Sequence, residues 1–131
     1  MKKLLLILSL LLITTNIYAD YTLYGKNVDD DILFYDNSTV KRNGDKVKVW
    51  TYMNISPNDK EAKSRNVGSA RGLNEIDCVN ETFKILSVRS YTKPNLQDEI
   101  NGETNLNSNP TISYISPDSV SAVLMQLVCK K

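Results

Sequence analysis

The 131-residue sequence contains no histidine and only two cysteines, Cys78 and Cys129. Without histidine, the chain lacks the side chain that most often acts as a general base at neutral pH and that most often binds transition metals. Its 16 basic residues nearly balance its 15 acidic residues, so no overall charge attracts it to nucleic acid or to an anionic membrane surface. We therefore predict that it is not an enzyme, binds no nucleic acid, and has no catalytic residue, metal site or cofactor.

The sequence also lacks an apolar stretch of the roughly 20 residues that a membrane-spanning helix needs. Its longest apolar run, Leu4 to Ile13, follows two lysines and leads to the small residue Ala19. This arrangement is typical of a secretory signal peptide. We predict a signal peptide at residues 1–19 and one mature domain at residues 20–131. Because no cysteine ends the apolar run, we expect an exported protein without a lipid anchor or an integral membrane segment, in the periplasm, at the cell surface or secreted.

Export places the two cysteines in an oxidising compartment, where a pair of thiols usually forms a disulfide. Cys78 and Cys129 are the only available partners, so the connectivity has one solution. The alternative is that both are buried free thiols, because free cysteine behaves as a small apolar residue. We predict the Cys78–Cys129 disulfide.

The mature chain has the patterns of a β-rich domain. Alternation between Lys46 and Ile55 predicts the clearest strand, with Val47 and Val49 on one face and Trp50 and Tyr52 on the other. Weaker signals predict strands at 21–24, 32–35, 74–79, 82–91 and 97–103, a short helical or irregular piece at 37–41, and a turn at Asn43-Gly44.

The C-terminal segment changes to a helical period. Ser116-Pro117-Asp118-Ser119 resembles a helix start, with a capping residue, proline and an early acid. The apolar stripe that follows is Val120, Val123, Leu124, Leu127 and Val128. A helix this short is marginal alone, so it must pack on the sheet. The fold class is therefore α+β: a single antiparallel β-sheet with a C-terminal helix packed on one face and tied to it by the disulfide. On an ideal helix, Cys129 lies well off this stripe.

Several short segments, in order over nearly the whole mature chain, carry a family resemblance. They are Phe34-Tyr35-Asp36, Val40-Lys41-Arg42-Asn43-Gly44 with Val47-Lys48-Val49-Trp50, Glu75-Ile76-Asp77-Cys78, Leu86-Ser87-Val88 with Tyr91, Ile115-Ser116-Pro117-Asp118-Ser119, and Val128-Cys129-Lys130. In these segments the chain resembles the bacterial surface-adhesin protein E family. The resemblance implies a single antiparallel sheet whose C-terminal helix is held to the concave side by the disulfide. It also implies binding to host extracellular-matrix or serum proteins.

Two groups of side chains form a candidate binding patch. They are the basic residues Lys60, Lys63, Arg65 and Arg71, and the aromatic residues Trp50 and Tyr52. The basic group forms a local positive region that could contact acidic host proteins or polysaccharide, although a solvated loop explains it as well. The aromatic pair is expected in the core under the helix; the alternative is an exposed groove or a dimer surface.

Two polar segments receive no function. Asp29-Asp30-Asp31 has oxygen ligands suitable for calcium but lacks the spacing of a known calcium loop, so we expect a solvated turn before a strand. The segment from Asn101 to Ser113 is rich in asparagine and serine and is predicted to be a mobile loop.

Three functional classes remain at this point. The first is an exported adhesin-like protein that binds a protein partner. The second is a periplasmic structural or accessory protein that uses the same scaffold to bind a bacterial partner or itself, and a homodimer is compatible with both. The third, a hydrolase with a serine–lysine or carboxylate pair, is disfavoured because Lys84 and Ser87 should point to opposite faces of their strand.

Overall fold

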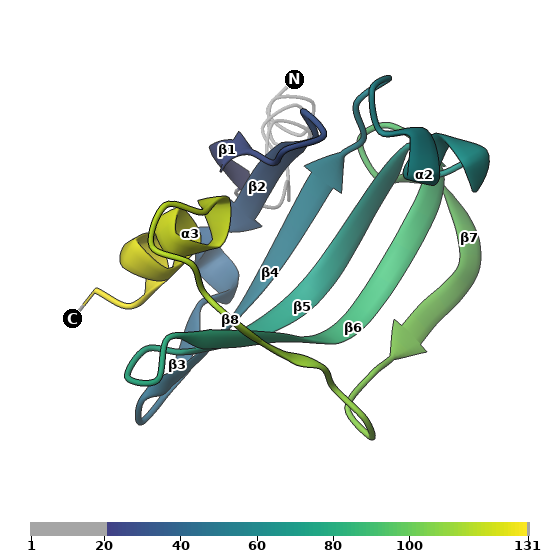
Figure 1. Cartoon of the computed structure of the whole chain (residues 1–131). Coiled ribbons are helices and arrows are strands. Elements are labelled where there is room, and N and C mark those ends of the chain that lie inside the picture. Colours follow the sequence, from purple (N-terminus) through teal and green to yellow (C-terminus); the bar gives the residue numbers. More distant parts are fainter. Residues whose placement is uncertain (1–20, 131) are drawn as a thin grey trace, which may run out of the picture.

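A computed structural model describes residues 21–130 as an open antiparallel sheet with a C-terminal helix (Figure 1). The strands are β1 (Tyr21–Lys26), β2 (Ile32–Asp36), β3 (Lys41–Asn43), β4 (Lys46–Asn54), β5 (Ser69–Asp77), β6 (Thr82–Lys93), β7 (Gln97–Asn105) and β8 (Ile112–Tyr114). The helical elements are the 3-10 turn η1 (Asn37–Thr39), the short helix α2 (Lys60–Ser64) and the C-terminal helix α3 (Val120–Val128). The predicted signal peptide lies outside the described residues.

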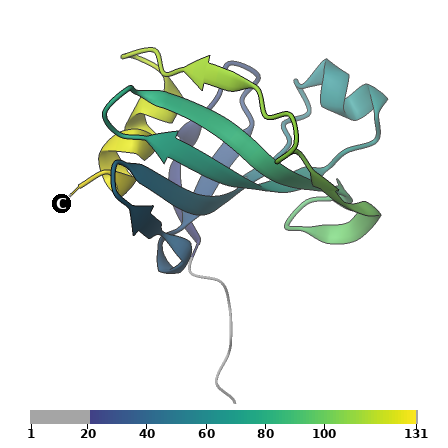
Figure 2. The same cartoon turned by 90° about the horizontal axis from the view of Figure 1, so that it is seen from below.

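The sheet has eight strands in the order β1-β2-β4-β5-β6-β7. The short strands β3 and β8 pair with the parts of β4 and β6 that β2 and β7 leave free: β3 pairs with residues 46–48 of β4, and β8 pairs with residues 82–84 of β6. All of the pairs are antiparallel. The predicted single antiparallel sheet is therefore confirmed, with α3 in contact with it (Figure 2).

Strand β4 has one buried and one exposed face over its first half. Val47 and Val49 are fully buried, whereas Lys46 and Lys48 are exposed. Val47 lies opposite Ile76 of β5, which is also buried. We call the side of the sheet that carries Val47 and Val49 the inner face, and the opposite side the outer face.

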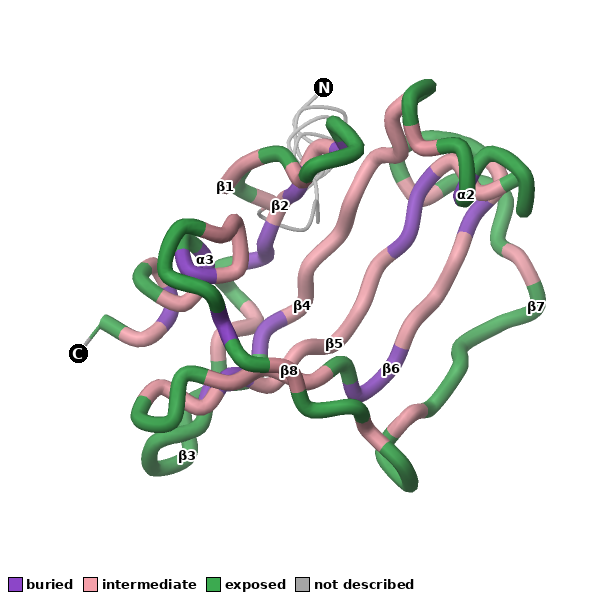
Figure 3. The backbone as a smooth tube through the Cα atoms, viewed as in Figure 1, coloured by how far each residue is buried: buried purple, intermediate pink, exposed green. Residues whose placement is uncertain are grey.

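Helix α3 packs on the inner face. Its residues Leu124 and Val128 belong to the same buried cluster as Tyr35, Val49 and Ile76. Figure 3 shows buried positions in α3, β2 and the first part of β4, whereas β7 is mostly exposed. Burying each such aliphatic side chain contributes about 1.5–3 kcal/mol, so tertiary packing holds a helix too short to be stable alone.

The disulfide between Cys78 and Cys129 is present, with a Cα–Cα distance of 5.9 Å. Cys78 follows the last residue of β5, and Cys129 is the C-cap of α3. The bond therefore ties the end of the helix to the sheet at the end of β5, and the predicted disulfide is confirmed. Arg42 adds a second tie, because its Nη2 atom donates hydrogen bonds to the carbonyl oxygens of Val128 (3.3 Å) and Lys130 (3.1 Å).

The position of α3 differs from the sequence-based expectation in two ways. The helix begins at Val120, because Ser119 is the N-cap and its hydroxyl accepts a hydrogen bond from the Ala122 N–H. Residues 116–119 instead form a turn. The buried side is also rotated: Ala122 is buried, whereas Val123 of the predicted stripe is 42% exposed.

Strand β1 approaches α3 at a glycine. A Cβ atom on Gly25 would lie 2.8 Å from Cγ2 of Val120, closer than carbon atoms can pack. The missing side chain lets the first turn of α3 lie against the edge strand.

Three expectations about loops need correction. The predicted mobile loop from Asn101 to Ser113 is wrong at both ends, because it includes the end of β7 and the start of β8. The polar stretch after β4 is not all loop: it contains α2, where the Asp59 carboxylate accepts a hydrogen bond from the Ala62 N–H. Residues 41–43, expected as part of an irregular piece and a turn, form β3 beside β4.

Candidate functional site

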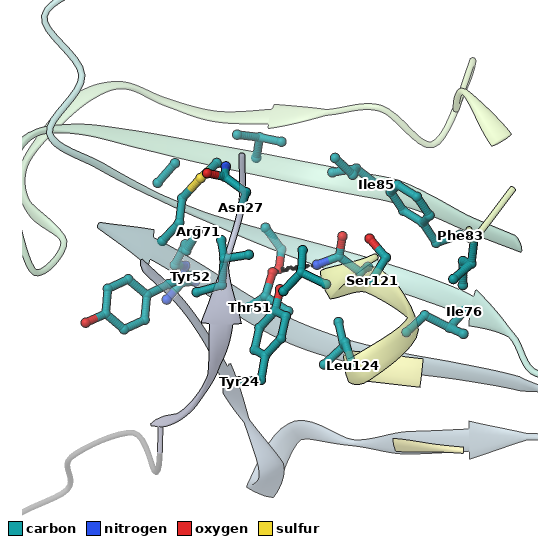
Figure 4. Close-up of a pocket in the computed structure, with 18 residues that line it drawn as sticks. Tyr24, Asn27, Thr51, Tyr52, Arg71, Ile76, Phe83, Ile85, Ser121 and Leu124 are labelled. Carbon is teal, nitrogen blue, oxygen red and sulfur yellow. Dashed lines mark hydrogen bonds between the residues drawn. The ribbon is translucent and has the colours of Figure 1, made fainter. Parts of the chain in front are cut away.

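A groove lies on the inner face between α3 and strands β4, β5 and β6, with a volume of about 340 Å³ (Figure 4). The helix covers Val47 and Val49, but Thr51 and Met53 further along the same face are only half-buried. The apolar residues lining the groove include Leu33, Met53, Ile76, Phe83, Ile85, Val88, Ile115, Val120 and Leu124. The groove exists because α3 covers only part of the inner face.

Small side chains form the floor of the groove. In the sheet register, Gly72 lies between Thr51 of β4 and Val88 of β6. A Cβ atom on Gly72 would lie 3.2 Å from the carbonyl oxygen of Ser87 and 3.7 Å from Cγ2 of Ile85. The absence of a side chain at Gly72 therefore leaves room above the centre of the sheet.

The polar groups in the groove are uncharged. The Asn74 amide donates hydrogen bonds to Oγ1 of Thr51 (2.7 Å) and to the carbonyl oxygen of Gly72 (3.3 Å). Asn27, Ser121 and Tyr24 also line it, and burial raises the pKa of the Tyr24 phenol to about 12. Tyrosine is already neutral in the physiological range, so Tyr24 adds no charge to the groove.

Two other residues border the groove but direct their side chains elsewhere. Arg71 and Tyr52 point away from Ile85 and Leu124 in Figure 4. Strand alternation explains this, because Arg71 lies between Ala70 and Gly72 on β5 and so faces the outer side of the sheet. The groove thus receives no charged side chain from its lining residues.

The outer face carries an aromatic cluster. Tyr52 stacks on Phe34 with ring centroids 4.5 Å apart, and Tyr21 meets Tyr52 edge to face at 4.7 Å. The guanidinium of Arg71 lies 4.5 Å from the centre of the Trp50 ring. The expectation that Trp50 and Tyr52 form core under the helix is wrong, because they lie on the face that α3 does not contact, and both are half-buried.

Two arginines face each other across β5 and β6 on this side. Arg71 is directly opposite Arg89, and like charges in this position repel. Arg89 is paired with Glu99 (3.3 Å) and Glu103 (3.4 Å). Within residues 21–130, Arg71 has no such carboxylate partner, and its contact is the Trp50 ring.

The other three basic residues of the candidate binding patch lie at α2, which follows β4 in the chain (Figure 1). Lys60 and Lys63 are on the helix and exposed, and Arg65 is its C-cap. Arg65 forms an exposed ion pair with Glu61 at 3.3 Å, which contributes little to stability. The six candidate residues are therefore in two places: three on the outer face of the sheet and three at α2.

The acidic segment before β2 is more structured than a solvated turn. Asp31 is buried; its carboxylate accepts hydrogen bonds from the Ser56 N–H (2.7 Å) and from the Asn27 amide (2.9 Å). Oxygens of Asp29, Asp31 and Asp59 lie within 4.8 Å of one another. Burial raises the pKa of Asp31, while the Ala62 N–H lowers that of Asp59. The hydrogen bonds of Asp31 join the β1–β2 loop to the segment after β4.

Sequence reasoning assigned no role to the two polar groups at the groove floor, Thr51 and Asn74. The signal was present, because Thr51 interrupts the apolar series of β4 on the buried face. A polar residue at such a position needs a partner, and Asn74 supplies it from the next strand.

These observations define a class of protein that consists of an open antiparallel sheet and a C-terminal helix. A disulfide links the helix to the sheet, and the outer face of the sheet is polar and aromatic. A model of the surface-adhesin protein E family matches residues 21–130. The chain belongs to that family.

Solved structures agree on the fold. Crystal form II of Haemophilus influenzae protein E has a TM-score of 0.59 and 16% identity, over 88% of this chain and 91% of that chain. Protein E from non-typeable Haemophilus influenzae has a TM-score of 0.57 and 17% identity, over 88% of this chain and 78% of that chain. No curated protein matches the chain in sequence. Among residues 21–130, no helix has the length and apolar character to cross a bilayer.

Proposed function

We propose that this chain is an exported adhesin-like protein that binds another protein, with host extracellular-matrix or serum proteins as its partners. The observation that carries the proposal is the family match across residues 21–130. The outer face of the sheet also supports the proposal. No helix of the described residues packs over its aromatic rings and the Arg71 guanidinium, so these groups can contact a partner.

The contact region is the candidate patch identified from the sequence. Arg71, held over Trp50, offers a charge without a carboxylate partner among the described residues. The exposed Lys60 and Lys63 add positive charge at α2. Aromatic residues and arginine are enriched in the centres of protein interfaces, and charges at a rim raise the association rate of an acidic partner.

Binding of the exported protein to immobilised matrix and serum proteins tests the proposal. The variant Lys60→Glu/Lys63→Glu should slow association about tenfold at low salt, because it reverses two rim charges. The control Val123→Glu/Gln126→Glu/Lys130→Glu makes the same change of four charge units at exposed positions on and just after α3, on the other side of the sheet, and should bind as the parent does. Equal loss in both variants would show that only net charge matters.

Localisation separates this proposal from the periplasmic alternative. Mass spectrometry of the exported protein should show a new N-terminus near Asp20 and no lipid. A tagged protein on the cell surface should be cleaved by external protease. Protection from protease, together with capture of a bacterial partner or a homodimer from periplasmic extract, would favour the structural or accessory function.

A further inference from the structure

The groove on the inner face is a second site, on the opposite side of the sheet from the proposed protein contact. Its volume of about 340 Å³ is near the lower end of the roughly 300–1,000 Å³ of small-molecule pockets. Its walls are apolar and come from α3 and from three neighbouring strands. It therefore has the size and lining of a site for one small apolar molecule.

The hydrogen-bonding groups at its floor indicate the chemistry of that molecule. Asn74 uses its amide N–H group on Thr51 and Gly72, so its carbonyl oxygen remains as an acceptor. Thr51 accepts from Asn74, so its hydroxyl hydrogen remains as a donor. Among the described residues, neither of these two atoms has a partner, and a ligand hydroxyl could bind to both.

The charge of the groove restricts the ligand further. Among the lining residues within 21–130, none carries a carboxylate or an ammonium group, and the one basic residue, Arg71, faces the other side of the sheet. Tyr24, like any tyrosine, is neutral at physiological pH, and burial raises its pKa further. An ionised ligand group would lose its hydration without gaining an opposite charge.

We propose that the inner-face groove binds a small neutral amphiphile, an aliphatic chain that ends in a hydroxyl group, with the hydroxyl at Thr51 and Asn74 and the chain between Ile85 and Leu124. This proposal is independent of the protein-binding function, because the residues involved lie on the other face.

Fluorescence of N-phenylnaphthylamine, a neutral apolar probe, tests the site with the oxidised, exported protein. The probe should bind, and decanol should displace it. Decanoate and decylamine, which have the same chain but a charge, should need at least about tenfold higher concentrations because the groove offers no counter-charge. Absence of probe binding, or displacement by decanoate as effective as that by decanol, would overturn the proposal.

Two tryptophan variants form a matched pair. Ile85 and Val123 are 37% and 42% exposed, but only Ile85 lines the groove. Ile85→Trp should abolish probe binding, and Val123→Trp should not change it. If both variants bind the probe equally, the groove is not the site.

A third variant tests the polar floor. Thr51→Val keeps the shape of the side chain and removes the hydroxyl, so probe binding should persist while decanol binds about fivefold more weakly, as expected for one lost hydrogen bond. Methyl NMR of the unmodified protein gives a result that does not depend on any variant. Decanol should shift the methyl signals of Ile85, Val88 and Leu124; shifts confined to Leu73 on the outer face would contradict the proposal.

Discussion

The Cys78–Cys129 disulfide should supply a large share of the stability of this domain. The perturbation is the double variant Cys78→Ser/Cys129→Ser, which removes the bond without leaving a single reactive thiol. The bond closes a loop with a sequence separation of 51 residues. In the chain-entropy model, closing a loop of this length removes about 4 kcal/mol of conformational freedom from the unfolded state. Marginally stable domains have about 5–15 kcal/mol in total, so the loss should be severe.

Urea unfolding measures this loss. With a slope of about 2 kcal/mol per molar urea for a small domain, the midpoint should fall by about 2 M relative to the oxidised parent. The reduced parent should behave like the double variant. A variant within about 1 kcal/mol of the parent, or a free thiol in the native protein, would refute the loop-entropy account of the bond.

The structure also predicts where the variant loosens first. Without the bond, the end of α3 is held by Leu124 and Val128 in the core and by the two hydrogen bonds from Arg42. Strand β4 is paired on both sides. Hydrogen exchange should therefore rise first in residues 118–130 and later in β4. Simultaneous exchange in both segments would show that helix and sheet open as one unit.

Three further predictions concern single side chains. Val49→Asp should unfold the domain, because Val49 is fully buried and an unpaired buried charge costs several kcal/mol; Lys48→Asp on the exposed face should be mild, and equal effects in thermal melts would mean that the faces are misassigned. Arg42→Ala should lower the free energy of unfolding by about 1 kcal/mol and raise hydrogen exchange at the end of α3, because two hydrogen bonds are lost. Lys41→Ala, at the exposed neighbouring position, should change neither. The pKa of Asp77 is lowered, mainly by the hydrogen bond that its carboxylate accepts from the Asn80 N–H in the β5–β6 turn. The ionised carboxylate therefore stabilises the fold fully above the ordinary aspartate pKa of about 3.9, and this stabilisation is lost as the pH falls through the lower pKa of the folded state. Asp77→Ala should therefore destabilise the protein at pH 7 but not in strong acid, and a constant difference across a pH series of urea unfolding would contradict this.

The sequence predicted the central strands well, because their alternation reflects one strongly buried face. Val47 and Val49 were placed correctly for this reason. The short strands β3 and β8 were missed since neither has a buried face that would produce a pattern: Lys41, Arg42 and Asn43 are all exposed, and so are Ile112 and Tyr114. Pairing with a longer neighbour defines these strands, and pairing by itself leaves no periodic signal in the sequence.

The groove could not be predicted, because it depends on where α3 stops covering the inner face. The alternation of β4 continues through Thr51 and Met53, which suggests that the buried core continues there too. The buried cluster that includes α3 contains Val47 and Val49 but not Thr51 or Met53. Likewise, alternation put Trp50 and Tyr52 on one face but could not show which face the helix would choose. The two valines decide it, since they offer apolar surface with no polar group to satisfy.

The rotation of α3 resolves the difficulty that Cys129 presented. On the predicted stripe, Val123 faces the sheet and Cys129 points away from it, which would require the last turn to unwind. The last turn does not unwind, because the Cys129 N–H still donates to the carbonyl oxygen of Met125 at 2.8 Å. The helix instead presents Ala122, Met125 and Cys129 to the core side, and these residues are three and four apart and so share one face. Val123 is turned outward as a consequence. The disulfide and the apolar residues together thus determine the rotation of the helix. A stripe drawn from the apolar residues alone, without the cysteine, predicts the wrong rotation.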